Sequence, residues 1–198
     1  MYSYSIEQAI RAAAVLHRDQ NRKGSMAFPY ITHLMSVAFM LHDYTDKEEV
    51  IVAALLHDAI EDTDYTLDEL EEDFGSTVRE LVNTLSEKKM AGERKLSWGE
   101  RKRNYAKALK AGPKDAVMIA AVDKVHNFRT IVEDYYEDHT RFLQDFGKNL
   151  DERLEVYQII ANVINNRLEG PLLNEFNHVF ESYKEFIYAI KKAQDKQF

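Results

Sequence analysis

The stretch ALLHDAIEDT, residues 54–63, decides the fold because it ends the most apolar run of the chain with ionisable side chains. The run itself reads VIVAALL and predicts a central, buried helix over 48–60. His57 and Asp58 follow it directly, and Glu61 then lies near both on the helix surface, at spacings of four and three residues. Burying several carboxylates is tolerable mainly around a cation. This helix therefore predicts a charged site inside an all-helical core.

Two further places put polar side chains on apolar helices. Asp123 ends an apolar run within AAVDKVHN, residues 120–127, and His33 lies on one face of a helix expected to begin at Thr32. Each residue alone is more often a cap, a surface group or a hydrogen-bonded core histidine. Together with the polar groups in 54–63, at least four polar side chains would have to be buried at a cost in stability, each for a separate structural reason. A single functional site is the simpler explanation.

The two imidazoles and two carboxylates form a mixed nitrogen and oxygen ligand set. Without thiolates, such a set fits a hard or borderline divalent ion, and ligand type leaves manganese, iron and zinc open. A divalent ion with open positions can bind phosphate oxygens and acidify a water to a pKa of about 7. Glu61 and Asp62 lie close enough in the sequence to orient that water or to relay protons.

The rest of the chain predicts one all-α domain over residues 1–198, a bundle of about eight to ten helices. Only seven glycines and three prolines occur, and helical periodicity continues almost throughout without a linker or an internal repeat. The polar stretch 88–95 is expected to be an exposed loop. Ser5 is the expected N-cap of the first helix. The expected helices are 5–19, 32–41, 48–60, a short one within 64–74, 76–86, 97–110, 114–135, 150–168 and 171–192.

Composition and charge exclude several classes of protein. The absence of cysteine excludes a disulfide scaffold, a zinc ribbon and thiol catalysis. A net charge of −8 is unlike that of a general nucleic-acid binder, for which phosphate neutralisation dominates affinity. The N-terminal segment lacks the features of a signal peptide, and no window approaches the ~20 apolar residues that span a bilayer. We therefore expect a cytoplasmic protein without a nucleic-acid or membrane partner.

Four segments together resemble the HD-domain phosphohydrolases. The closer resemblance is to the hydrolase domain of the Rel/Spo-type alarmone enzymes and to the small single-domain alarmone hydrolases. It spans about residues 5–135, with a weaker echo in SWGERKRNY, residues 97–105, and helices over about 150–192 are expected to pack on that core. The four segments are HRDQNRKGSMAFPYITH (17–33), ALLHDAIEDT (54–63), FGSTVRELV (74–82) and DKVHNFRT (123–130).

The resemblance implies an HD-domain helical bundle around one divalent ion, usually manganese. The reaction implied is hydrolysis of the 3′-pyrophosphate of guanosine tetra- or pentaphosphate, a small phosphorylated nucleotide. Glu61 and Asp62 would be the catalytic acidic pair. The metal ligands implied are His33, His57, Asp58 and Asp123.

The resemblance also implies where the substrate lies. Arg22 and Lys23 resemble the residues that pack on the base and meet phosphate, while Asn127 and Thr130 would contact the ribose and phosphate side. Further cations come from Lys124 and Arg129 in the last motif. Arginine suits both base stacking and phosphate binding.

The loop around Arg22 leaves the substrate open. It is longer than in the alarmone enzymes through residues 25–27, and Leu34 stands where the family commonly has proline. One alternative is an HD phosphatase for an adenosine alarmone, NADPH or a nucleoside monophosphate. Another is a catalytically idle nucleotide-binding domain, against which the intact pair at 61–62 argues. The chain is too short to add a synthetase domain, so hydrolysis alone is expected.

The remaining features have structural explanations. ERKRNY, residues 100–105, is expected to be a solvated helix face, with a phosphate contact from Arg101 or Lys102 as the alternative. The aromatic residues of 135–188 are expected to fill the core, and a homo-oligomer contact there stays open. The histidines not expected to bind metal are His17, His42, His126, His139 and His178, of which His126 lies nearest to the site.

Overall fold

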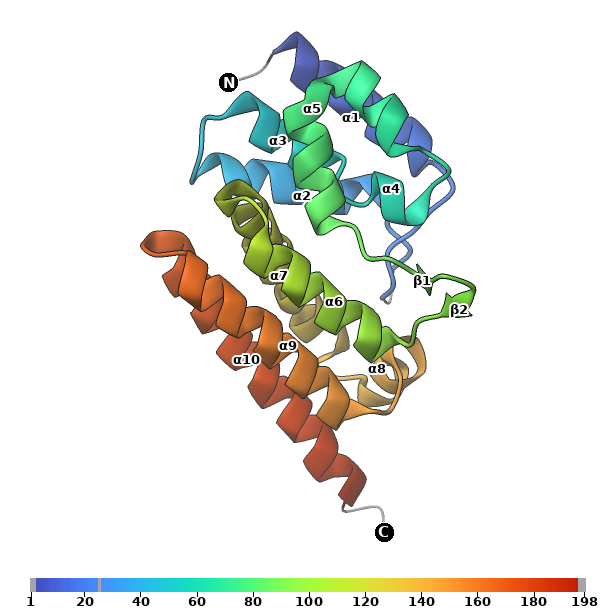
Figure 1. Ribbon diagram of the computed structural model, residues 1–198. Coiled ribbons are helices and arrows are strands. Elements are labelled where there is room, and N and C mark those ends of the chain that lie inside the picture. Colours follow the sequence, from blue (N-terminus) through green and yellow to red (C-terminus); the bar gives the residue numbers. More distant parts are fainter. Residues whose placement is uncertain (1–2, 25, 196–198) are drawn as a thin grey trace.

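The computed structural model describes residues 3–24 and 26–195. Their regular secondary structure is helical apart from one short hairpin and an isolated bridge, and turns and loops connect the helices (Figure 1). The predicted all-α class is therefore confirmed. The hairpin pairs β1 (Met90–Ala91) with β2 (Arg94–Lys95) in antiparallel register. The helices are α1 (Tyr4–Leu16), α2 (Ile31–His42), α3 (Glu48–Leu55), α4 (Ala59–Asp62), α5 (Leu67–Leu85), α6 (Trp98–Ala111), α7 (Lys114–Tyr135), α8 (His139–Phe146), α9 (Leu150–Arg167) and α10 (Pro171–Asp195).

The helices gather into two groups that share α7. Helices α1 to α5 form one end of the molecule, while α6, α9 and α10 run side by side at the other (Figure 1). α10 packs along α7, α9 packs along α6, and α2 contacts both α3 and α7. One cluster of buried hydrophobic residues extends from Ile6 to Ile190, which supports the expected single domain.

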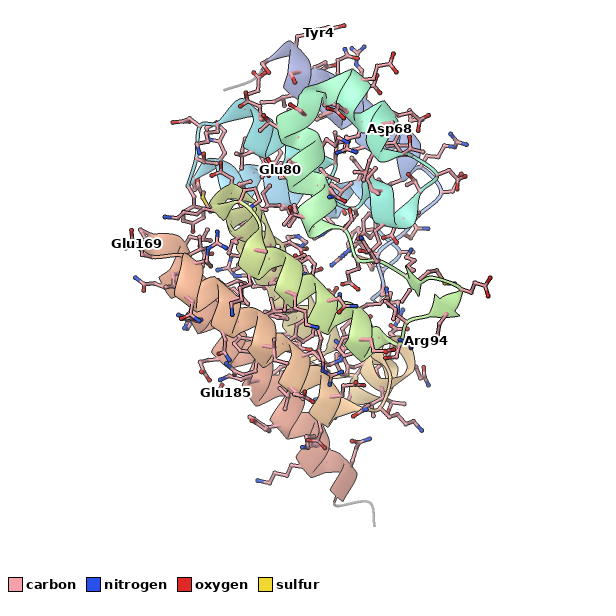
Figure 2. All side chains as sticks on the ribbon, viewed as in Figure 1. Tyr4, Asp68, Glu80, Arg94, Glu169 and Glu185 are labelled. Carbon is pink, nitrogen blue, oxygen red and sulfur yellow. The ribbon has the colours of Figure 1, made fainter. Side chains whose placement is uncertain are left out.

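The outer surface carries the charged side chains. Examples labelled in Figure 2 are the exposed side chains of Asp68 and Glu80 on α5, Arg94 on β2, Glu169 just before α10 and Glu185 on α10. None of the described helices has the length and apolar character that crossing a membrane requires.

Helix α5 shows how local sequence fixes the elements. Thr66 and Glu69 form a reciprocal capping box at its start, which satisfies two backbone N–H groups that lack helical partners. Gly75, at φ 86° and ψ 167°, interrupts the helix where the sequence predicts a break. The expected helices on either side of this glycine are therefore both present.

Four local expectations are wrong. The N-cap of α1 is Ser3, whose hydroxyl accepts from the amide of Ile6, and not Ser5. The stretch 88–95 contains the hairpin, whose turn is opened by Gly92 at φ 60°. Helix α8 forms where no helix is expected, begun by the side chain of Asp138, which accepts from the backbone N–H of residue 141.

The fourth correction concerns the predicted helix 48–60. Helix α3 ends at Leu55, and α4 begins only at Ala59. His57 and Asp58 therefore lie in a break between two helices, with Asp58 in the sparsely populated bridge region at φ −98° and ψ −4°. The break frees both side chains from the 3.6-residue periodicity and turns them toward α7.

Candidate active site

The four predicted metal ligands come together from three parts of the fold. His33 lies in the first turn of α2, His57 and Asp58 lie in the break between α3 and α4, and Asp123 lies within α7. His33 Nε2 is 3.1 Å from Asp123 Oδ1 and 3.9 Å from Asp58 Oδ2. His57 Nε2 is 3.1 Å from Asp58 Oδ2 and 3.7 Å from Asp123 Oδ1. The nitrogen atoms thus alternate with the carboxylate oxygens around one point.

The two imidazoles each direct a nitrogen without a hydrogen-bond partner into this point. Nε2 of His33 and Nε2 of His57 are both buried, and neither has a hydrogen-bond partner among residues 3–24 and 26–195. His57 Nδ1 lies 2.8 Å from the carbonyl oxygen of Ala54 and donates its proton there, so Nε2 is the ring nitrogen that would bind an ion. A buried polar atom without a partner is rare in folded proteins.

A divalent ion would satisfy these atoms. Ligand atoms that each lie about 2.0–2.2 Å from one ion are themselves separated by about 3–4 Å, and the four nitrogen–oxygen distances given above lie in this range. His33, His57 and Asp58 alone place suitable atoms within 4.8 Å of one another. The residues present therefore fit a divalent metal ion, and Asp123 Oδ1 lies within 3.7 Å of Nε2 of both histidines.

Neighbouring polar groups orient the ligands. Tyr30 donates its hydroxyl to Asp58 Oδ2 at 2.7 Å, and burial together with the Asp58 charge raises the pKa of Tyr30 so that it stays protonated. Asn127 Nδ2 donates to Asp123 Oδ1 at 2.5 Å, and Lys124 Nζ lies 2.5 Å from Asp123 Oδ2. Such partners commonly fix the orientation and basicity of metal ligands. Sequence reasoning missed Tyr30, for which only its position within PYITH gave a signal.

His126 belongs to this surrounding group. Its Nδ1 lies 3.0 Å from Nδ1 of His33, on the opposite side of the His33 ring from the unpaired Nε2. With His33 as donor, this contact fixes the tautomer that presents Nε2 to the ion. Burial is the main reason that the pKa of His126 is lowered, to about 4, so the ring is a neutral acceptor.

Glu61 and Asp62, the predicted catalytic pair, occupy α4 beside the ligands but differ in environment. Glu61 Oε2 accepts from the backbone N–H of Glu87 at 3.1 Å, and Oε1 lies 3.6 Å from Nη1 of Arg101. Burial, and then the Glu87 charge, raise the pKa of Glu61 to about 7. Asp62 is exposed and pairs with Lys89 at 3.2 Å. A carboxyl with a pKa near neutrality is suited to proton transfer.

A cavity of about 290 Å³ opens beside these carboxylates and is lined by cations. Arg153, Lys102 and Lys124 together lower the pKa of the buried Tyr157 although burial opposes this. The direction of this shift indicates a positive potential around Tyr157, on the side of the cavity suited to phosphate groups. The cations lining the cavity are Arg22, Lys23, Lys102, Lys124 and Arg153.

Lys102 and Arg153 change the expected composition of the site. The segment 100–105 is not simply a solvated face, because the Lys102 side chain is only 17% exposed, pairs with Glu87 and lines the cavity. Arg153 on α9 is 5% exposed and donates from Nη2 to the carbonyl of Phe146 at 2.9 Å. Sequence reasoning missed Arg153, since no motif surrounds it.

A second cavity of about 260 Å³ adjoins the first and shares several lining residues with it. Arg22 connects the loop before α2 to α7 across this cavity, since its Nη2 donates to Asn127 Oδ1 at 2.7 Å and to Thr130 Oγ1 at 3.4 Å. Lys23 Nζ donates to the carbonyl of Asp145 at 2.5 Å, next to the ring of Phe146. The predicted residues Arg22, Lys23, Asn127 and Thr130 thus meet at the junction of the two cavities.

Arg129 does not share this arrangement. Its side chain is 45% exposed and Nη2 pairs with Glu175 on α10 at 2.7 Å. It lines neither of the two adjoining cavities. The structure therefore does not bring Arg129 together with the other predicted substrate contacts, because this residue lies two positions from Asn127 and so on a different face of α7. Residue 25, in the lengthened loop, lies outside the described residues.

Known proteins resemble this chain over most of its length. A guanosine-3′,5′-bis(diphosphate) 3′-pyrophosphohydrolase MESH1 from Mus musculus is 34% identical over 165 residues, covering 75% of this chain and 89% of that protein. A guanosine-3′,5′-bis(diphosphate) 3′-pyrophosphohydrolase from Haemophilus influenzae is 38% identical over 183 residues, covering 86% of this chain and 25% of the other.

A solved structure and a family model agree with these relatives. The structure, described as a metazoan ortholog of SpoT that hydrolyzes ppGpp, has a TM-score of 0.75 and 25% identity, covering 91% of this chain and 96% of its own. The family model describes an HD domain and matches residues 9–162. An HD domain implies a divalent metal, for which the unpaired imidazole nitrogens provide a site. Together these matches and the geometry show that the chain belongs to the HD domain family.

Proposed function

We propose that this HD-domain hydrolase removes pyrophosphate from the 3′ position of guanosine tetra- or pentaphosphate, with Mn²⁺ as its ion. The observation that carries the proposal is that unpartnered imidazole nitrogens, carboxylates and cationic side chains lie around one cavity. Two unpartnered imidazole nitrogens and two carboxylates lie at one end of a cavity whose other walls carry five cations. The printed activities of the relatives from Mus musculus and Haemophilus influenzae support the same reaction.

The bond changes assign roles to the surrounding side chains. A water oxygen attacks the phosphorus bonded to ribose O3′, the bond from that phosphorus to O3′ breaks, and O3′ takes up a proton as pyrophosphate leaves. When bound, the ion supplies positive charge to the phosphate oxygens and lowers the pKa of water. Glu61 accepts a proton from the attacking water, and the exposed Asp62 passes it to solvent.

The cations hold the phosphates in line for this attack. Burial alone would lower the pKa of Lys124, but Asp123 raises it well above its ordinary value, so the ammonium group stays charged. Lys102 is held by Glu87, and Arg153 by the carbonyl of Phe146. These partners fix the cations before substrate arrives, which limits the reorganisation that binding requires. The adjoining cavity takes the nucleoside.

Pyrophosphate release by metal-stripped protein, with and without added Mn²⁺, tests the proposal. Release from guanosine 3′,5′-bis(diphosphate) that depends on Mn²⁺ is expected, and parallel titrations with Zn²⁺ and Fe²⁺ test the choice of ion. A panel containing an adenosine alarmone, NADPH and nucleoside monophosphates tests the alternatives. Turnover of monophosphates alone, with orthophosphate as product, would contradict the proposed reaction. Nucleotide binding without turnover of any compound would indicate an idle domain.

A further inference from the structure

The second cavity contains a carboxylate that none of the roles above uses. Asp134 lies in the last turn of α7 and lines the 260 Å³ cavity. Among residues 3–24 and 26–195, no hydrogen bond or ion pair to its side chain lies within the usual limits. This exposed carboxylate can therefore accept hydrogen bonds from whatever fills the cavity, since an ionised carboxylate has acceptors only.

The position of Asp134 is set by the loop opposite. A Cβ atom on Gly24 would lie 3.0 Å from Asp134 Oδ2, and Gly24 has φ +135°, in a region that L side chains rarely adopt. Arg141 on α8 donates to the carbonyl oxygen of this glycine and ties the loop to the same wall. Backbone and carboxylate thus approach each other as closely as the absence of a side chain allows.

The other walls of this cavity suit a flat aromatic ring. Ile131 and Tyr135 are buried apolar neighbours, and Phe146 contributes a third apolar surface. The guanidinium of Arg22 lies 5.7 Å from the ring centre of Tyr30 and offers a planar cation for stacking. A base held between such surfaces is fixed in its plane, so its edge must face a defined part of the wall.

We propose that Asp134 reads the base of the substrate by accepting two hydrogen bonds from the N1–H and N2 amino groups of guanine. This inference rests on the proposed function, because it places the nucleoside of that substrate in the second cavity. Guanine presents two parallel donors that match the two oxygens of a carboxylate. Adenine presents an acceptor at N1, which the carboxylate repels, and hypoxanthine presents a single donor. Asp134 is therefore a specificity-determining residue that favours guanine over both.

Substitution by asparagine gives a test that loss of folding cannot imitate. The Asn amide keeps one acceptor but places an NH2 donor where the carboxylate had its second acceptor, so it faces one of guanine's two donors with a donor. We measure kcat/KM for the 3′,5′-bis(diphosphates) of guanosine, inosine and adenosine. In the wild type, we expect the order guanosine, inosine, adenosine. Asp134→Asn should lower the ratio of guanosine to adenosine by roughly 5- to 150-fold, since a good bidentate contact supplies about 1–3 kcal/mol of discrimination.

Two further variants complete the comparison. Asp134→Ala removes both acceptors without adding a donor, so it should lower the same ratio without favouring adenosine. Glu133→Gln is the matched control, because Glu133 is the exposed neighbouring acid on α7 and lines neither cavity. A ratio that stays within about twofold of wild type in both Asp134 variants overturns the proposal.

Failure of this inference can be separated from failure of the proposed function. If the wild type hydrolyses the guanosine and adenosine compounds equally well, Asp134 does not read the base but the hydrolase assignment stands. If the wild type hydrolyses neither compound with Mn²⁺ present, the hydrolase assignment fails. In that case, calorimetric titration with GDP, IDP and ADP tests whether Asp134 still selects the base. Tighter binding of GDP than of ADP in the wild type, with the difference reduced in Asp134→Asn, supports the inference, and equal or absent binding in the wild type overturns it.

Discussion

The two ends of the main cavity hold their polar groups in opposite ways. At the metal end, Nε2 of His33 and Nε2 of His57 are buried and have no hydrogen-bond partner in the part of the chain that the structure describes. At the cation end, Lys102 is paired with Glu87, and Arg153 donates to a backbone carbonyl. The metal end is therefore complete only with an ion, whereas the cation end is organised by the protein itself.

This difference predicts how substitutions at each end should affect metal binding, stability and substrate binding. A buried polar atom without a partner is costly, so metal binding at His33 and His57 should stabilise the fold as well as support the reaction. The cation end already has its partners, so a substitution there should affect substrate binding and leave the metal in place. Activity, metal content and stability measured on the same variants can separate these two responses.

Removal of a ligand should have the largest effect. Asp58→Ala should abolish metal binding and lower kcat/KM by about 10³-fold or more, because the ion contributes several kcal/mol of charge stabilisation. Helicity should stay close to wild type, since Asp58 lies between helices and its loss relieves carboxylate crowding. Metal content, circular dichroism and pyrophosphate release check these points. Asp68→Ala, at an exposed acid, is the control, and full activity in Asp58→Ala would contradict the metal assignment.

Glu61→Gln should have the next largest effect and should change the pH profile. Loss of the proton acceptor should lower kcat by about 10²-fold while the metal stays bound. Because the pKa of Glu61 is about 7, the wild-type rate should fall as pH drops through 7, where the carboxylate becomes protonated. The variant should lack this dependence. A log kcat profile from pH 5 to 9 shows either result, and an unchanged profile in the variant would remove Glu61 from the reaction.

The same residue makes a separate prediction for stability. Its pKa is raised on folding from 4.5 to about 7, so ionised Glu61 destabilises the folded, metal-free protein as pH rises through that interval. Glu61→Gln should therefore be more stable than wild type at pH 8, by up to about 3 kcal/mol. The advantage should disappear below about pH 4.5. Urea unfolding of the metal-free proteins at both pH values measures it, and a variant that is less stable at pH 8 would contradict the burial of this charge.

The contrast between the two ends also explains how far the sequence could predict the site. The metal end depends on short segments in which polar residues interrupt apolar helices, so His57, Asp58 and Asp123 stand out by their neighbours alone. Periodicity did not reveal the break between α3 and α4, because Leu55 and Leu56 continue the apolar pattern through it. The all-α class could still be predicted from the same periodicity, because a misplaced helix end does not change the fold class.

The cation end was hidden for a physical reason. Arg153 reaches the cavity because α9 packs along α6, a contact between segments about fifty residues apart that no local pattern encodes. Lys102 sits in a run of charges that resembles any exposed helix face, and only its pairing with Glu87 draws it inward. Helix α8 and the β1–β2 hairpin were missed for similar reasons, since both are short and flank this end.

Lys102→Ala should test the cation end with an intermediate effect. Loss of a charged contact to phosphate should lower kcat/KM by about 10- to 100-fold, mainly through KM, because such hydrogen bonds contribute about 1.5–3 kcal/mol. Metal content should be unchanged. Lys107→Ala, an exposed lysine on α6 that does not line the cavity, is the matched control. Loss of the metal in Lys102→Ala would break the distinction between the two ends.

Arg129→Ala should have the smallest effect and is the sharpest check on the boundary of the site. Sequence reasoning grouped Arg129 with Asn127 and Thr130, but its guanidinium pairs with Glu175 at the surface. We expect kcat/KM to stay within about twofold of wild type, and stability to fall by less than about 1 kcal/mol, as for exposed ion pairs. Steady-state kinetics and urea unfolding measure both. A rise in KM as large as that of Lys102→Ala would mean that Arg129 leaves Glu175 to meet the substrate, and the cation end would then be less fixed than its contacts indicate.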